Sequence, residues 1–92
     1  MLETVKKHLR ISHSELNLEV EDLIEACKKD LEISGIASSS IDEDDALIKR
    51  AIITYCKAHF GYDNPDYERL IKAYDLLKSH LAISSDYEEE DE

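Results

Sequence analysis

Hydrophobic residues recur along this chain at spacings of three and four, the period of an amphipathic α-helix. The pattern predicts a short helix at about residues 2–10, a second at about 15–34 with one buried stripe, and a last one at about 65–82. No alternation typical of β-strands appears in the sequence. In the last segment the repeating apolar residues are Tyr67, Leu70, Tyr74, Leu77 and Leu81. The pattern therefore indicates an all-α fold.

The segment at about residues 43–60 is the most apolar of the predicted helices. On a helical wheel its polar side chains fill an arc of only roughly 140°, so roughly 220° must be covered by other elements. Those polar side chains are Lys49, Arg50, Thr54 and Lys57. We therefore expect a small bundle of about four helices around this central, buried helix.

Residues with known preferences for helix ends mark the boundaries. Gly35 and Gly61 follow the second and third helices and suit the left-handed conformation that stops a helix. Pro65 suits the first position of the last helix. The predicted N-caps come from Ser12–Ser14, Asp42–Asp45 and Asn64.

Composition divides the chain into a helical domain at residues 1–83 and an acidic tail at residues 84–92. The tail reads SSDYEEEDE, and repulsion among its six carboxylates predicts disorder. The whole chain of 92 residues carries 22 acidic and 11 basic residues, for a net charge of -11. Such a charge disfavours direct binding to nucleic acid or to anionic membranes.

The first residues, MLETVKKHLRIS, contain no apolar core of a signal peptide, and no apolar run is long enough to span a bilayer. We therefore expect a protein without a targeting signal, in a reducing intracellular setting. Cys27 and Cys56 fall on apolar helix faces, where a free thiol behaves as a small hydrophobic group.

The sequence offers little for catalysis or for cofactor binding. Cys56 and His59 are three residues apart, but the periodicity buries Cys56, whereas a nucleophilic thiolate must be exposed. The run Asp42–Asp45 lacks the spacing of a calcium-binding loop, and helix capping accounts for it. The histidines available to join Cys56 and His59 in a zinc site are His8, His13 and His80, without the paired spacing of such a site. We expect no catalytic residue, no metal and no cofactor.

The aromatic residues and one leucine are the remaining candidates for contacts. Tyr55, Tyr67 and Tyr74 lie on helix faces predicted to point inward, which favours packing. Tyr62 and Tyr87 lie outside the predicted helices and are free to meet a partner. Leu76 faces away from the apolar stripe of the last helix. We take these last three, Tyr62, Leu76 and Tyr87, as candidate interface residues.

The block IITYCKAHFGYDNPDYERLIKAYDLLKSHL at residues 52–81 resembles the C-terminal half of the small head–tail connector (adaptor) proteins of tailed bacteriophages and prophages, often called phage DNA packaging proteins. The opening VKKHLRIS at residues 5–12, with LIEACKKDLE at residues 23–32, is similar to the N-terminal half of that family. The turn FGYDNP at residues 60–65 is the most specific part of the resemblance.

The resemblance implies a structural virion protein of the neck, present in the host cytoplasm before assembly. Family members form a ring, generally of about a dozen copies, beneath the portal protein. There they extend the channel through which double-stranded DNA passes without being bound specifically, and they dock tail completion or stopper proteins. In such a ring the outward side of the last helix near Leu76 and the turn at Tyr62 are expected to form one contact face. Acidic charge lining the channel would repel passing phosphates.

Two readings from other classes remain open. An acidic DNA mimic that inhibits a host DNA-binding enzyme fits the charge, although such proteins spread their carboxylates over a surface at phosphate-like spacing. Here about a quarter of the carboxylates lie in the tail. An enzyme would require an activity with neither a metal nor a nucleophile identified.

Overall fold

The computed structural model describes residues 1–61 and 64–84, and within these ranges it contains four α-helices, one short 3-10 helix and no strand. The predicted all-α fold is confirmed, with helix ends that differ from the predicted ones by three residues or fewer. The elements are α1 (Leu2–Leu9), α2 (Asn17–Ile33), η1 (Ser38–Ser40), α3 (Ala46–His59) and α4 (Tyr67–Ile83). Apart from Ser84, the tail predicted to be disordered lies outside the described residues.

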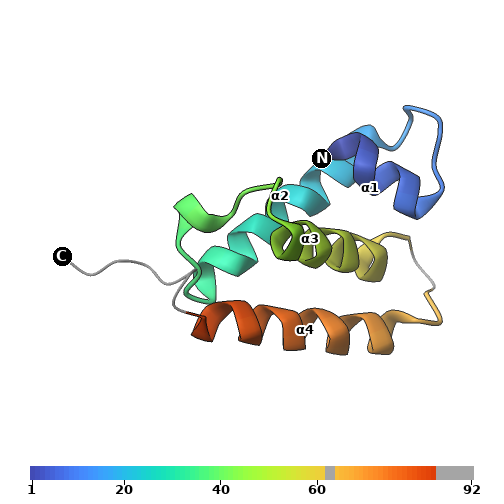
Figure 1. Cartoon of the computed structure of the whole chain (residues 1–92). Coiled ribbons are helices and arrows are strands. Elements are labelled where there is room, and N and C mark those ends of the chain that lie inside the picture. Colours follow the sequence, from blue (N-terminus) through green and yellow to red (C-terminus); the bar gives the residue numbers. More distant parts are fainter. Residues whose placement is uncertain (62–63, 85–92) are drawn as a thin grey trace.

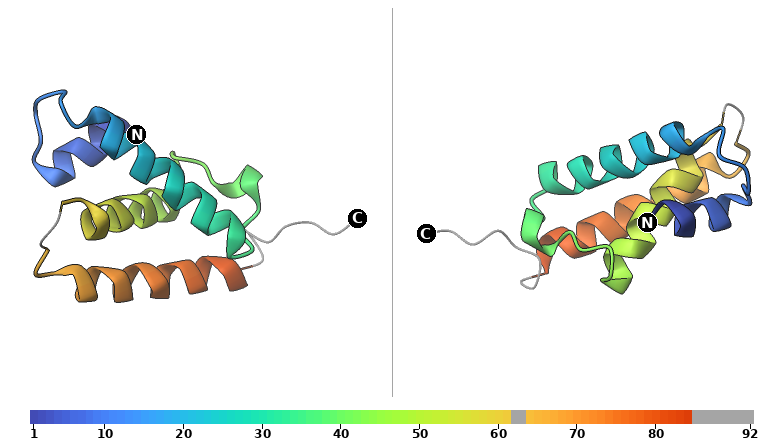
Figure 2. Two further views of the ribbon diagram at one scale, coloured as in Figure 1. Left: turned by 180° about the vertical axis from the view of Figure 1, so that it is seen from behind. Right: turned by 90° about the horizontal axis from the view of Figure 1, so that it is seen from above.

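Helix α3 lies between α2 and α4, and it also contacts α1 (Figure 1). Seen from above, α2 runs along one edge of the molecule, α1 lies on the other side, and α3 crosses obliquely toward α2 (Figure 2). The exposed residues of α3 are Ala46 and Leu47 in the first turn and Lys49, Arg50 and Lys57 on the polar face. The core that these helices enclose consists of Val5, Val20, Ile24, Cys27, Leu31, Ile36, Ile48, Ala51, Ile52, Cys56, Tyr74 and Leu81. The prediction of a buried central helix is confirmed.

Both glycines adopt the left-handed backbone that the sequence predicts, with φ of +102° at Gly35 and +86° at Gly61. After α2, the Ile36 amide donates to the Leu31 carbonyl at 3.2 Å and the Gly35 amide to the Glu32 carbonyl at 3.0 Å. This is the Schellman pattern, which satisfies carbonyls left open at a helix end. At the start of α3, the Asp45 carboxylate accepts from two backbone amides of the first turn.

Two predicted N-caps are wrong. Helix α2 begins after Leu16 with no side-chain hydrogen bond at its cap, so Ser12–Ser14 do not cap it. Helix α4 begins at Tyr67, two residues later than predicted, and Pro65 precedes it. Asn64 instead braces the turn: its Oδ1 accepts from the Asp66 amide at 2.9 Å and its Nδ2 donates to the Lys57 carbonyl at 2.7 Å. The amide of Asn64 can donate and accept at once, so it links the end of α3 to the residue before α4.

Helix α1 ends on a left-handed residue that is not a glycine. Arg10 has φ of 61°, its amide donates to the Lys7 carbonyl, and the Ile11 amide donates to the Lys6 carbonyl. A left-handed backbone costs a residue with a Cβ about 1 kcal/mol. Nothing in the sequence predicts this conformation at Arg10. In residues 1–61 and 64–84, no helix has the length and apolar character needed to cross a bilayer.

Candidate functional site

A polar cluster, here called the α2–α4 clamp, joins these two helices across the bundle. The hydroxyl of Tyr74, a residue only 2% exposed, donates a 2.6 Å hydrogen bond to the Asp30 carboxylate. The Lys78 ammonium donates to the same oxygen at 3.0 Å. The Cys27 thiol, also buried, donates to the Tyr74 hydroxyl oxygen at 3.7 Å. One carboxylate on α2 thus holds two side chains of α4.

The protonation of the clamp suits a structural role. Burial raises the pKa of Cys27 to about 12, although the hydrogen bond to Tyr74 acts the other way. Burial, followed by the hydrogen bond to Asp30, raises the pKa of the Tyr74 hydroxyl. Partial burial alone would raise the pKa of Asp30, but the bonds from Tyr74 and Lys78 outweigh it and bring the pKa below the usual 3.8. At neutral pH the clamp therefore contains a charged carboxylate, a protonated phenol and a protonated thiol.

Cys56 and His59 do not form a reactive pair. Cys56 is fully buried, as predicted, and burial raises its pKa to about 12, so the thiolate is scarce at neutral pH. The His59 ring instead packs on aromatic rings, with centroids 4.3 Å from Tyr55 and 5.7 Å from Tyr67. Across the described part of the chain, no three His, Cys, Asp or Glu side chains converge as metal ligands would.

Tyr67 corrects one prediction. The sequence places it on an inward face, but it is 43% exposed. Tyr67 is the first residue of α4, and His59 is the last residue of α3. The two rings pack edge to face at this end of the bundle. Tyr74 points inward as predicted, and Tyr55 is half-buried, with its ring edge-on to that of Tyr74.

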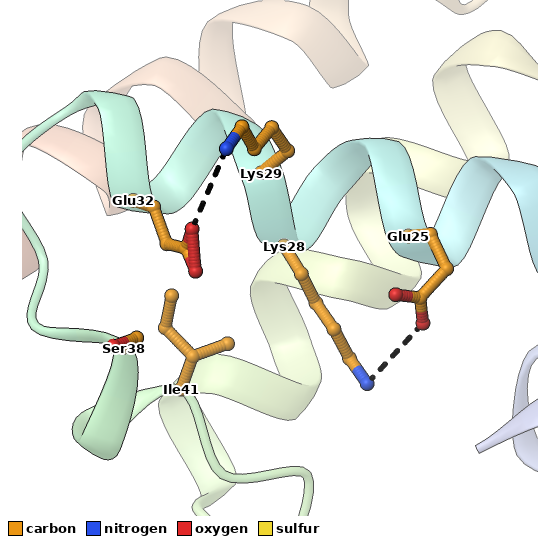
Figure 3. Close-up of a pocket in the computed structure, with 6 residues that line it drawn as sticks. All are labelled: Glu25, Lys28, Lys29, Glu32, Ser38 and Ile41. Atoms are coloured by element: carbon orange, nitrogen blue, oxygen red, sulfur yellow. Dashed lines mark ion pairs between the residues drawn. The ribbon is translucent and has the colours of Figure 1, made fainter.

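A charged hollow of about 210 Å³ lies between the second half of α2 and η1. Figure 3 shows Lys28 reaching Glu25 and Lys29 reaching Glu32, with Ser38 and Ile41 on the far wall. Lys28 also pairs with Glu43, a hydrogen bond that raises the pKa of Lys28 and lowers that of Glu43. These charges are paired with one another, so the hollow offers no unpaired charge to a ligand.

A second hollow, here called the basic groove, is lined by basic side chains from three helices, α1, α3 and α4. It has a volume of about 530 Å³ and contains a single carboxylate, Asp44, while Ile53, Leu70 and Ala73 supply its apolar surface. Its cationic and titratable basic residues are His8 from α1, Lys49, Arg50 and Lys57 from α3, and Arg69 from α4. Sequence reasoning identified the polar arc of α3 but missed the groove, because only the folded bundle brings α1 and α4 beside that arc.

Leu76 is exposed to 74% of its surface, on the side of α4 turned away from α3, as the sequence predicts. Together with Lys72, Asp75 and Ser79 it lines a shallow hollow, here called the Leu76 surface. Tyr62 and Tyr87, the other two candidate interface residues, lie outside the described residues. Whether any of the three contacts a partner stays a prediction at this point.

Comparison with known protein families identifies the family of the chain. A family model described as "Phage connector protein" matches residues 1–88. The chain belongs to the phage connector protein family. No curated protein and no solved structure gives a significant match.

Membership of the phage connector family indicates a structural role, in which a protein acts through the surfaces it presents to other virion proteins. For this connector the two surfaces of interest are the basic groove and the Leu76 surface. The α2–α4 clamp contributes indirectly, since it fixes α4, the helix that carries part of both surfaces.

Proposed function

We propose that this protein is a head–tail connector, or adaptor, that assembles as a ring of about a dozen copies beneath the portal of the filled capsid. In that position it extends the DNA channel and docks tail completion proteins. The family match over residues 1–88 is the observation that carries the proposal. The location that follows is the neck of the virion, reached from the host cytoplasm during assembly.

The distribution of polar groups supports a structural role. Asp30, Tyr74 and Cys27 are engaged with one another in the α2–α4 clamp, and Cys56 is buried as a protonated thiol. What the molecule presents to its surroundings is charge, together with a few exposed apolar side chains. Such a surface suits contacts with other proteins.

Leu76 is the residue of the described chain that we propose as a protein contact. An exposed leucine is ordinary when it stands alone, but Leu76 is on the same helix as Ile83, which is 79% exposed, and it lines a hollow. Burial of such a side chain in an assembly would contribute about 1.5–3 kcal/mol per contact. Tyr62 and Tyr87 are proposed to add contacts of the same kind.

The test is to mix the purified protein with the portal protein of the same phage and to weigh the complex by native mass spectrometry. We expect a discrete species with about a dozen added copies. Leu76→Gln should lower the number of bound copies without changing the melting temperature. Ile33→Gln, an equally exposed position at the end of α2, is the matched control and should bind as the wild type does. A portal that gains no mass in the presence of the wild-type protein would overturn the proposal.

The DNA-mimic alternative is less well supported. A mimic needs continuous negative charge over the surface that imitates DNA. Four of the 11 Lys and Arg residues instead gather in the basic groove, which interrupts that charge on one side of the bundle.

A further inference from the structure

We propose that the basic groove of one copy binds the acidic first half of α2 of the next copy, and that this contact joins neighbours in the ring. The inference rests on the proposed connector function and deepens it, since it names the two complementary surfaces. The proposed contact joins copies of this chain to one another and does not involve the portal.

The basic groove of this acidic protein contains cations that have no ion-pair partner. Within residues 1–61 and 64–84, the ion pairs engage Lys28, Lys29, Arg69 and Lys78 but none of Lys49, Arg50 and Lys57. These three unpaired cations lie along the polar face of α3, with Lys49 and Arg50 on one turn and Lys57 about two turns further on. In a chain of net charge -11, a concentration of unpaired positive charge favours an anionic occupant.

The first half of α2 has the matching chemistry. From Ile11 to Cys27 the chain contains no Lys or Arg and five carboxylates. Leu18 on this stretch is 77% exposed, and Glu21 and Asp22 stand three and four residues further along, on the same face of the helix. The carboxylates of this surface are Glu15, Glu19, Glu21, Asp22 and Glu25.

Leu18 of α2, with carboxylates before and after it in the chain, is complementary to a groove that has both apolar and basic lining residues. Leu18 would lie against the surface formed by Ile53, Leu70 and Ala73, while its neighbouring carboxylates would reach the lysines and the arginine of α3. Duplex DNA is a weaker candidate, because phosphates gain nothing from that apolar surface and the net charge of the protein repels them. A second copy of this chain supplies both features.

The two surfaces lie on different sides of the subunit. No residue of α2 lines the groove, whose lining residues come from α1, α3, α4 and the turn before α3. A contact between two different surfaces of identical subunits is heterologous, and repetition of it closes a ring or builds a filament. The groove also lies near the Leu76 surface, since Ala73 and Leu76 are three residues apart on α4.

A charge-swap experiment tests this contact on the portal complex described above. The groove variant is Lys49→Glu/Lys57→Glu, and the helix variant is Glu21→Lys/Asp22→Lys. Each should reduce the number of copies bound to the portal about tenfold or more, because like charges then face each other at every contact. The chain with all four substitutions should restore wild-type occupancy, since each contact again joins opposite charges. Lys7→Glu/Lys29→Glu, at exposed positions outside the groove, makes the same change in net charge and should assemble normally.

Circular dichroism and thermal melting of every variant establish that it folds. Normal assembly of both charge-reversed variants, or no recovery in the fourfold variant, would overturn the proposed contact while leaving the connector function intact. A wild-type protein that does not bind the portal would instead overturn the connector function. Binding of a duplex DNA oligonucleotide that is lost in the groove variant would overturn the inference in favour of nucleic acid.

Discussion

The α2–α4 clamp gives the sharpest prediction about stability. Replacing Tyr74 by Phe removes one hydroxyl from a buried position and leaves the ring and its packing in place. The lost interaction is a 2.6 Å hydrogen bond to a charged carboxylate, a class worth about 1.5–3 kcal/mol. The Asp30 side chain is 36% exposed, so water compensates part of the loss. We therefore expect the free energy of unfolding to fall by about 1–2 kcal/mol, and the melting temperature by about 5–15 °C.

A double-mutant cycle of Tyr74→Phe and Asp30→Asn, measured by urea denaturation followed by circular dichroism, isolates the pair. We expect a coupling energy of about 1 kcal/mol. Tyr67→Phe is the control, because it deletes the same hydroxyl at an exposed position, and it should change stability by less than about 0.5 kcal/mol. A coupling energy within about 0.3 kcal/mol of zero would refute the reasoning, since the Tyr74–Asp30 hydrogen bond would then contribute nothing measurable to stability.

The pH dependence of the same pair follows from the direction of its pKa shift. The pKa of Asp30 is lower in the folded protein than in the unfolded chain. Its contribution is therefore fully present above the unfolded-state pKa, and is lost as the pH falls through the folded-state pKa. The stability difference between the wild type and Tyr74→Phe should be constant from neutral pH down to about pH 5 and should narrow in stronger acid. A difference that grew on acidification would contradict the assignment of a charged Asp30.

Three further predictions concern the ends of the fold and its thiols. Arg10→Gly should raise the free energy of unfolding by about 0.5–1 kcal/mol in urea denaturation, because glycine adopts the left-handed backbone at the end of α1 without strain; a loss of stability would show that the Arg10 side chain makes a compensating contact. Cys27 and Cys56 should react with Ellman's reagent at neutral pH only after denaturation, since both thiols are buried and have pKa values of about 12; rapid reaction of the native protein would show that the core opens. Deletion of residues 84–92 should shift the melting temperature by no more than about 2 °C, as expected for a tail whose carboxylates repel one another, and a large loss measured by calorimetry would make the tail part of the fold.

Much of the fold follows from the sequence, because its strongest signals are local. The apolar circumference of α3 identified the central helix, and Gly35 and Gly61 marked where two helices stop. The N-caps were harder to place. Asn64 has the right chemistry for a cap but bonds to Lys57 and Asp66 instead, a choice decided by the geometry of the whole turn.

The candidate surfaces were harder to predict from the sequence than the helices, for a physical reason. Leu76 could be found because a single helix determines which way it faces. The basic groove combines Lys49 and Lys57 with Arg69 and His8, which are distant in the chain and meet only when three helices pack. Likewise, the Asp30–Tyr74 bond joins residues 44 positions apart. Helical periodicity contains no information about such pairings.

Cryo-electron microscopy of the protein bound to its own portal is the most direct test of the central claim. The account predicts a single closed layer of copies around the channel axis, with α2 of each copy lying against the α3–α4 groove of its neighbour. Isolated copies scattered on the portal, or no added density beneath it, would contradict the claim that this protein is a ring-forming connector.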